Sequence, residues 1–119
     1  MPKKSLENLT ESMFYVLMAF YEKPLCGIEV VELIEQKTAG RVKLGPATLY
    51  TILAKFEKVH YITEIDIDGR KRTYQITAKG RTAYQEEIMR LKQCICDADA
   101  HQEGGEKDEH LSLSTMSCL

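Results

Sequence analysis

The residues best suited to chemistry are cations gathered in two short stretches of the chain. The six side chains are Lys43, Lys55, Lys58, Arg70, Lys71 and Arg72. Lysine and arginine neutralise phosphates, so a single face carrying both stretches would bind the backbone of a nucleic acid. The first stretch also offers hydroxyl-bearing side chains at Thr48, Tyr50 and Thr51. Side chains of this size and polarity can approach base edges in a groove.

Other chemistries find little support in the sequence. It has no glycine-rich phosphate loop and no arrangement of Ser, His and Asp, or of Cys and His, that would build a nucleophile. The four cysteines form no C-x-x-C pair. Cys94 and Cys96 would diverge by about 200° on a helix and would not chelate one metal ion. We therefore expect no enzyme activity, no cofactor and no metal.

The first element that must position the cations is an N-terminal helix ending near Glu22. Its apolar residues recur at helical spacing, and Pro24 stops it. They are Leu6, Leu9, Met13, Val16, Leu17 and Phe20. A helix that is apolar on most of its circumference makes contact on two sides. We expect the domain core on one side and a partner subunit on the other.

A second and a third helix follow. The second opens at Gly27, ends near Gly40 and precedes a short extended piece over 42–44. Its inward residues are expected to be Ile28, Val31, Leu33 and Ile34. The third begins at Pro46, where the missing N–H of proline costs nothing. Its inner stripe is expected to be Leu49, Ile52, Leu53, Phe56 and a half-buried, structural His60. The hydroxyl and lysine side chains then face outward.

A β-hairpin is predicted over 61–77. Asp68-Gly69 separates two β-rich segments, and a two-residue Asp-Gly loop is among the strongest hairpin signals. With that loop Ile67 pairs with Arg70. The residues expected on the core face are Tyr61, Ile65, Tyr74 and Ile76. The cations of the second stretch then cluster at the tip.

Thr77 can cap a fourth helix that starts at Ala78. A heptad-like stripe on it predicts a dimer seam, although it could also pack back on its own domain. The stripe is Tyr84, Ile88, Leu91 and Ile95. We therefore divide the chain into a DNA-binding domain over 6–77, a dimerisation helix over 78–97 and an acidic, disordered tail over 98–119.

Size and charge agree with this division. The 119 residues and 13.6 kDa allow one domain. The formal net charge is −2, but residues 1–96 carry 15 basic and 12 acidic side chains, whereas residues 97–119 carry one and six. No stretch reaches the roughly 18 apolar residues of a membrane span. We expect a cytoplasmic protein without membrane contact.

Three helices with a basic outer face on the third, followed by a basic-tipped hairpin, are typical of a winged helix-turn-helix. The fold class expected is therefore mainly α with a small β-hairpin, plus the C-terminal dimerisation helix. In such a fold the third helix enters the roughly 12 Å wide major groove. Cations on either side of it neutralise phosphates.

The same residues carry a family resemblance. The segments 24–27, 40–50 and 69–77, with Gly80 after them, resemble the PadR family of transcriptional regulators. The resemblance implies a winged-helix domain that binds an operator as a homodimer, usually to repress. It places Thr48, Tyr50 and Thr51 on the recognition helix and the three cations 70–72 on the wing. The sequence departs from the family at Gly45 and Ala47, where Ser and Gly are common.

Three functions compete on this evidence. The first is a homodimeric repressor on double-stranded DNA with a roughly palindromic operator, and the second is a winged-helix module that binds protein instead. Basic residues on both the third helix and the hairpin favour the first. The third, weaker hypothesis is a small-molecule sensor in which DNA binding is secondary. Four side chains of the first helix could line an effector pocket at the dimer interface, although core packing accounts for them better. They are Met13, Phe14, Tyr15 and Met18.

Overall fold

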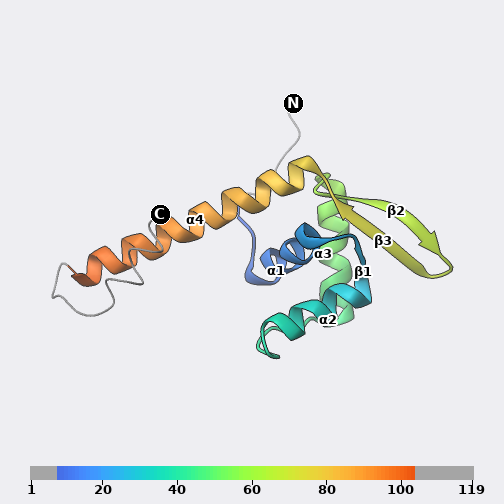
Figure 1. Ribbon diagram of the computed structural model, residues 1–119, viewed down its shortest axis with the longest axis horizontal. Helices are drawn as coiled ribbons and strands as arrows, with labels where there is room; N and C mark the ends of the chain where they lie inside the picture. Colours follow the sequence, from blue (N-terminus) through green and yellow to red (C-terminus); the bar gives the residue numbers. More distant parts are fainter. Residues whose placement is uncertain (1–7, 104–119) are drawn as a thin grey trace. The chain divides into compact units, whose positions relative to one another are not determined.

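The computed structural model describes residues 8–103. They form four helices and three strands in two compact units, the first ending at Tyr84 and the second beginning at Gln85 (Figure 1). The elements are α1 (Glu11–Glu22), β1 (Leu25–Cys26), α2 (Gly27–Lys37), α3 (Pro46–Lys58), β2 (Ile62–Asp68), β3 (Lys71–Ile76) and α4 (Ala78–Glu103). No helix among the described residues is long and apolar enough to cross a membrane.

Helix α1 begins later than its apolar pattern predicted. Thr10 is the N-cap, and its Oγ1 accepts a hydrogen bond from the Met13 N–H at 3.2 Å. A threonine in this position satisfies one of the four backbone donors that a helix start leaves unpaired. Five residues of α1 enter the core, namely Met13, Val16, Leu17, Ala19 and Phe20. Leu6, which the pattern included, lies outside the described residues.

Helix α2 differs from the prediction at one of the positions expected to face the core. Val30 and Ile34 are buried, whereas Ile28 is 71% exposed. Residues two apart on a helix point about 200° apart, so a face centred on Val30 excludes Ile28. The expected extended piece at 42–44 is not a strand. It is a loop held by a hydrogen bond from the Val42 N–H to Thr38 Oγ1 at 3.0 Å.

Helix α3 has Pro46 in its first turn and a buried stripe at the predicted positions. The buried residues are Leu49, Ile52, Leu53 and Phe56. His60 does not continue this stripe, because the helix ends at Lys58. His60 is exposed and has a φ of 66°, in the turn that leads to β2. The expectation of a half-buried His60 is therefore wrong.

The sheet has three antiparallel strands in the order β1-β3-β2. Strand β1 was not predicted from the sequence, and its two residues pair with Tyr74 and Thr73 of β3. The β2–β3 turn also differs by one residue from the prediction, since Asp68 pairs with Lys71 and Gly69-Arg70 forms the loop. Gly69 has a φ of 64°. Glycine at the first loop position is the type II′ arrangement, which matches the twist of the strands.

A β-bulge lies in β2 between Glu64 and Asp66. Glu64 is opposite Tyr74 and Asp66 is opposite Thr73, so Ile65 is the extra residue. A bulge interrupts the alternation of side chains along a strand. Ile65 is accordingly 48% exposed and does not share the core face, contrary to the prediction. Tyr61, Ile62, Tyr74 and Ile76 are the buried residues of this region.

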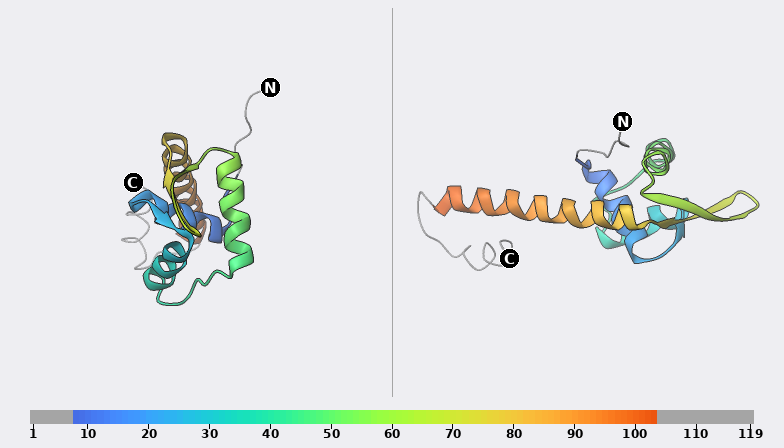
Figure 2. Two further views of the ribbon diagram at one scale, coloured as in Figure 1. Left: turned by 90° about the vertical axis from the view of Figure 1, so that its right-hand side faces the viewer. Right: turned by 90° about the horizontal axis from the view of Figure 1, so that it is seen from above.

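The wing, defined here as β2, β3 and their turn, starts beside α3 and extends beyond the helices of the first unit (Figure 2). It leads through Thr77 into α4. Thr77 Oγ1 accepts from the Gly80 N–H at 3.0 Å, as expected for a helix cap. Helix α4 continues to Glu103, so the end expected at residue 97 falls inside the helix. Residues 104–119 of the expected tail lie outside the described residues.

Candidate nucleic-acid interface

The outer face of α3 is the first component of the candidate interface. Its buried stripe anchors the helix, and every residue between the stripe positions is exposed. The side chains expected to contact DNA are among them: Thr48, Tyr50, Thr51, Lys55 and Lys58. Tyr50 is 65% exposed, so it is not a core-edge aromatic. Thr51 Oγ1 donates to the Ala47 carbonyl oxygen at 2.9 Å, which leaves this hydroxyl oxygen as an acceptor.

The wing is the second component, and its three exposed cations are not equivalent. Lys71 Nζ lies 4.0 Å from Glu29 Oε2, and Arg72 Nε lies 3.5 Å from Glu64 Oε2. A hydrogen bond with Tyr74, and then the charge of Glu64, raise the pKa of Arg72. Arg70 forms no ion pair within residues 8–103. It is therefore the wing cation that is freest to bind a phosphate.

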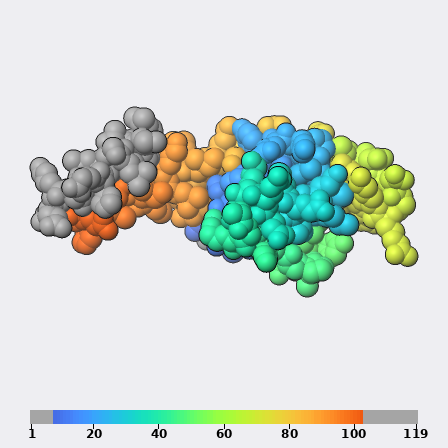
Figure 3. All heavy atoms as spheres, turned by 60° about the horizontal axis from the view of Figure 1, so that its bottom comes forward, coloured from blue at the N-terminus to red at the C-terminus, as the bar shows by residue number. Residues whose placement is uncertain are grey.

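A groove of about 430 Å³, called the wing groove below, joins the two components. It is lined by Cys26 of β1, the start of α2, two residues of α3, the three wing cations and Tyr74. The residues are Cys26, Gly27, Ile28, Glu29, Tyr50, Leu53, Arg70, Lys71, Arg72 and Tyr74. It brings Tyr50 together with the cations of the wing, as the sequence analysis expected of one face. In the space-filling view, α2, α3 and the wing share a face (Figure 3).

Five of the expected contact residues do not line the wing groove. They are Lys43, Thr48, Thr51, Lys55 and Lys58. Lys43 is exposed in the loop before α3, and the other four are exposed on α3 itself. The expected residues thus form two groups, one around the groove and one along the outer face of α3.

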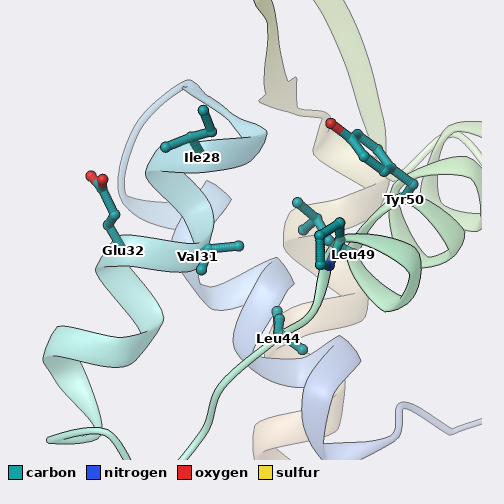
Figure 4. Close-up of a pocket in the computed structure, with 7 residues that line it drawn as sticks. Ile28, Val31, Glu32, Leu44, Leu49 and Tyr50 are labelled. Carbon is teal, nitrogen blue, oxygen red and sulfur yellow. The ribbon is translucent and has the colours of Figure 1, made fainter.

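A second pocket, of about 330 Å³, lies between α2 and α3 and is mainly apolar. In Figure 4, Val31, Leu44 and Leu49 lie between the two helices, with Tyr50 and Glu32 at opposite edges. Ile28 and Tyr50 line both this pocket and the wing groove. The exposed side chains of Ile28 and Tyr50 therefore separate a mainly apolar pocket from the groove that carries the wing cations.

Glu29 is a groove residue that the sequence analysis did not select. It is the third residue of α2, and its Oε1 accepts from the Cys26 N–H at 2.9 Å. The hydrogen bond from the Cys26 backbone is the main reason that the pKa of Glu29 is lowered, with the Cys26 side chain and then Lys71 and Lys23 contributing. The spacing Cys26-x-x-Glu29 is that of a capping box, which is the signal that could have identified this residue.

The four residues of the expected dimer seam differ in their surroundings. Tyr84, in the first unit, is half-buried, with its ring 5.3 Å from that of Phe14 and 4.7 Å from that of Tyr21. Burial raises the pKa of Tyr84. Ile88 and Leu91, in the second unit, are half-buried, and Ile95 is 46% exposed. The neighbouring Met89, which was not part of the predicted stripe, is 71% exposed.

The arrangement of helices, sheet and wing defines a winged-helix protein, and solved structures agree. A transcriptional regulator from Clostridium thermocellum superimposes with a TM-score of 0.67 at 24% identity, over 74% of this chain and 89% of that one. RosR from H. salinarum has a TM-score of 0.62 at 16% identity, over 82% and 99%. The PcaV regulator from Streptomyces coelicolor, solved with its natural ligand, has a TM-score of 0.59 at 18% identity, over 77% and 64%. These likenesses establish the fold.

Residues 16–86 match the transcriptional regulator PadR-like family, and the chain belongs to it. The family resemblance seen in the sequence is thereby confirmed. A 37.1 kDa transposon protein of Streptomyces fradiae is 32% identical over 77 residues, which are 65% of this chain and 22% of that protein. Protein X of Lysinibacillus sphaericus is 28% identical over 79 residues, covering 63% of this chain and 72% of that protein. The chain thus spans less than a quarter of the first relative.

Proposed function

We propose that the protein represses transcription by binding, as a homodimer, a roughly palindromic operator in double-stranded DNA. The observation that carries this proposal is the meeting of Tyr50, on the exposed face of α3, with the three wing cations around one groove. A polar, basic helix face beside a basic hairpin offers both kinds of contact that DNA requires. Phosphate contacts fix the position of the protein, and base-edge contacts select the sequence.

The two groups of residues take different parts in this proposal. Arg70, Lys71 and Arg72 bind the phosphate backbone or the adjacent minor groove. Lys43, Lys55 and Lys58 bind phosphates on either side of α3, which lies in the major groove. Thr48, Tyr50 and Thr51 approach the base edges or the adjacent backbone. This division follows from side-chain chemistry. The small threonines at 48 and 51 let α3 approach the groove closely, the Tyr50 hydroxyl can form hydrogen bonds there, and the long cations reach outward to phosphates.

The homodimer in this proposal forms through α4, along the predicted seam that begins at Tyr84. Ile88, Leu91 and Ile95 recur at spacings of three and four and retain partial exposure in the single chain. Two recognition helices related by a two-fold axis would meet half-sites about one helical turn apart, or 34–36 Å. The two-fold symmetry is the reason for expecting a palindromic operator. The proposal also allows a small-molecule effector, whose identity it does not specify.

The decisive experiment measures DNA affinity across a salt series. An operator is first obtained by in vitro selection from random duplexes, and fluorescence anisotropy then compares it with a scrambled duplex. If about three of the six candidate cations in each subunit contact phosphates at one time, a dimer neutralises about six charges, so log K should fall with log salt at a slope near −5. Arg70→Ala should flatten that slope by about two units and weaken both duplexes alike. Lys92→Ala removes an exposed cation of α4 and serves as the matched control.

Two results would overturn DNA binding. One is a binding signal that does not depend on salt, and the other is wild-type affinity in a variant with Ala at positions 70–72. Either result would favour the alternative function, a winged-helix module that binds protein. A search for protein partners of the same surface would then replace the search for an operator.

A further inference from the structure

One acidic side chain stands among the cations of the wing groove. Within the described residues, Glu29 is the only carboxylate in the groove lining, where it accompanies Arg70, Lys71 and Arg72. Its side chain is 45% exposed. An acid in this position would repel the phosphates that the wing cations attract. Its presence therefore needs a physical account.

The carboxylate is held in place from two sides. Oε1 accepts from the Cys26 N–H at 2.9 Å, and Oε2 lies 4.0 Å from Lys71 Nζ. Cys26 belongs to β1 and pairs with Thr73 of β3, two residues after Lys71. The start of α2, strand β1 and the wing are thus joined around one side chain. Glu29 cannot turn away from the wing without losing its bond to the helix start.

We infer that Glu29 competes with DNA phosphates for Lys71 and thereby lowers the affinity of the protein for every duplex. The inference rests on the proposed function, since it concerns the same groove. In the free protein the carboxylate partly neutralises the lysine. In the complex the lysine exchanges this partner for a phosphate, and the carboxylate left behind opposes the backbone. Non-specific binding, which depends on phosphate contacts alone, is kept weak by the same repulsion.

Glu29→Gln tests this inference, because the amide oxygen can still accept from the Cys26 N–H while the charge is removed. Exposed ion pairs contribute modestly, so we expect affinity to rise by about threefold per subunit and therefore by roughly tenfold for a dimer. Operator and scrambled duplexes should gain alike. The salt slope should become more negative by about one to two units. Glu35→Gln removes the same charge from an exposed position on α2 outside the groove, and should change affinity by less than about twofold.

Substitutions of Lys71 add a test that does not depend on folding of the Glu29 variant. Because Lys71 is already paired and Arg70 is not, Lys71→Met should weaken DNA binding by less than Arg70→Met does. In the Glu29→Gln background the loss from Lys71→Met should grow to roughly that of Arg70→Met. A purely structural role of Glu29 as a helix cap predicts instead the same loss from Lys71→Met in both backgrounds.

The outcomes separate this inference from the proposed function. If the wild-type protein shows no salt-dependent DNA binding, the proposed function and the inference about Glu29 are both refuted. If the wild-type protein binds DNA but Glu29→Gln behaves like Glu35→Gln, the competition by Glu29 is refuted and the proposed function stands. Equal losses from Lys71→Met and Arg70→Met in the wild-type background refute it as well. Tighter binding by Glu29→Gln, together with a larger loss from Lys71→Met in that variant, supports it.

Discussion

Gly80, in the first turn of α4, is the position where the structure predicts the sharpest effect of one methyl group. A Cβ at this residue would lie 2.3 Å from the Tyr61 carbonyl oxygen and 2.8 Å from Ile76 Cγ1. Neither neighbour can easily move. The Tyr61 oxygen accepts from the Thr77 N–H at 2.9 Å, and Ile76 is buried in the sheet. Gly80→Ala must therefore shift the backbone where the sheet leads into α4.

The size of the effect follows from two opposing terms. Alanine inside a helix is favoured over glycine by about 0.8–1.0 kcal/mol. Forcing a methyl group into a packed site costs typically about 1–3 kcal/mol, and the clash here is with backbone. We expect the second term to prevail, so that Gly80→Ala lowers the free energy of unfolding by about 1–2 kcal/mol. The sign is the opposite of what helix propensity alone predicts.

Urea denaturation followed by far-UV circular dichroism, at one fixed protein concentration, measures this difference. Thr82→Ala is the control, because residue 82 is exposed on the same helix and its substitution should change the free energy of unfolding by less than about 0.5 kcal/mol. A Gly80→Ala protein as stable as the wild type, or more stable, would refute the packing argument. It would mean that the backbone around the Tyr61 carbonyl can move to admit the methyl group without a loss in the free energy of unfolding.

The remaining predictions concern the cap of α3, the dimer, the recognition helix and acid stability. Gly45 caps α3 without a side-chain hydrogen bond, so Gly45→Ser should raise the free energy of unfolding by a few tenths to about 1 kcal/mol in urea titrations; a loss would mean that serine is strained there. Leu91→Asp places charges in the expected seam of α4 and should give a monomer in sedimentation, whereas a persistent dimer would move the interface elsewhere. Thr51→Glu should abolish operator binding measured by anisotropy, because the longer, negatively charged side chain repels DNA, while the circular dichroism spectrum stays unchanged. Retained binding would contradict the placement of α3 in the major groove. The lowered pKa of Glu29 means that its contribution to stability is complete at neutral pH and is lost as the pH falls through that pKa, so Glu29→Gln should lose less stability than the wild type between pH 7 and pH 3.

Helix periodicity accounts for most of the fold that could be predicted. The buried stripe of α3 at Leu49, Ile52, Leu53 and Phe56 was predicted residue by residue, because four side chains at helical spacing define one face. The same reasoning failed at Ile28 and His60. Ile28 lies at the edge of a short helix whose inner face is centred on Val30. His60 follows the end of its helix, where the period no longer applies.

The sheet was less predictable, for a physical reason. Asp68-Gly69 and Gly69-Arg70 are both acceptable two-residue loops. Moving the loop by one residue changes each cross-strand pair by two residues, so the same residues still share a face near the turn. The bulge at Ile65 exchanges the faces farther along β2, and alternation alone does not reveal a bulge. Strand β1 has two residues, too few to form a pattern. Its pairing with β3 is a long-range contact that local propensity does not encode.

The candidate site shows the same limit in its electrostatics. Exposure of the α3 residues and of the wing cations could be predicted, since the first follows from helical periodicity and the second from their position at the tip of the hairpin. The partners of the cations could not, because Glu29 and Lys71 meet only after α2, β1 and β3 have assembled. Counting the charges of the wing therefore overestimates its attraction for phosphate. Two of its three cations already have carboxylate neighbours.

The residues that determine the fold and those that would select an operator are separate sets on α3. The buried stripe fixes the helix against the core, and structures at 16–24% identity retain the same scaffold. The exposed positions between the stripe residues contribute little to that packing, so they can change without loss of the fold. Under the proposed function, membership of the PadR-like family constrains where a DNA contact can form but not which bases it selects. A sequence preference would then come from the exposed residues of this chain, and the proposal assigns it above all to Thr48, Tyr50 and Thr51.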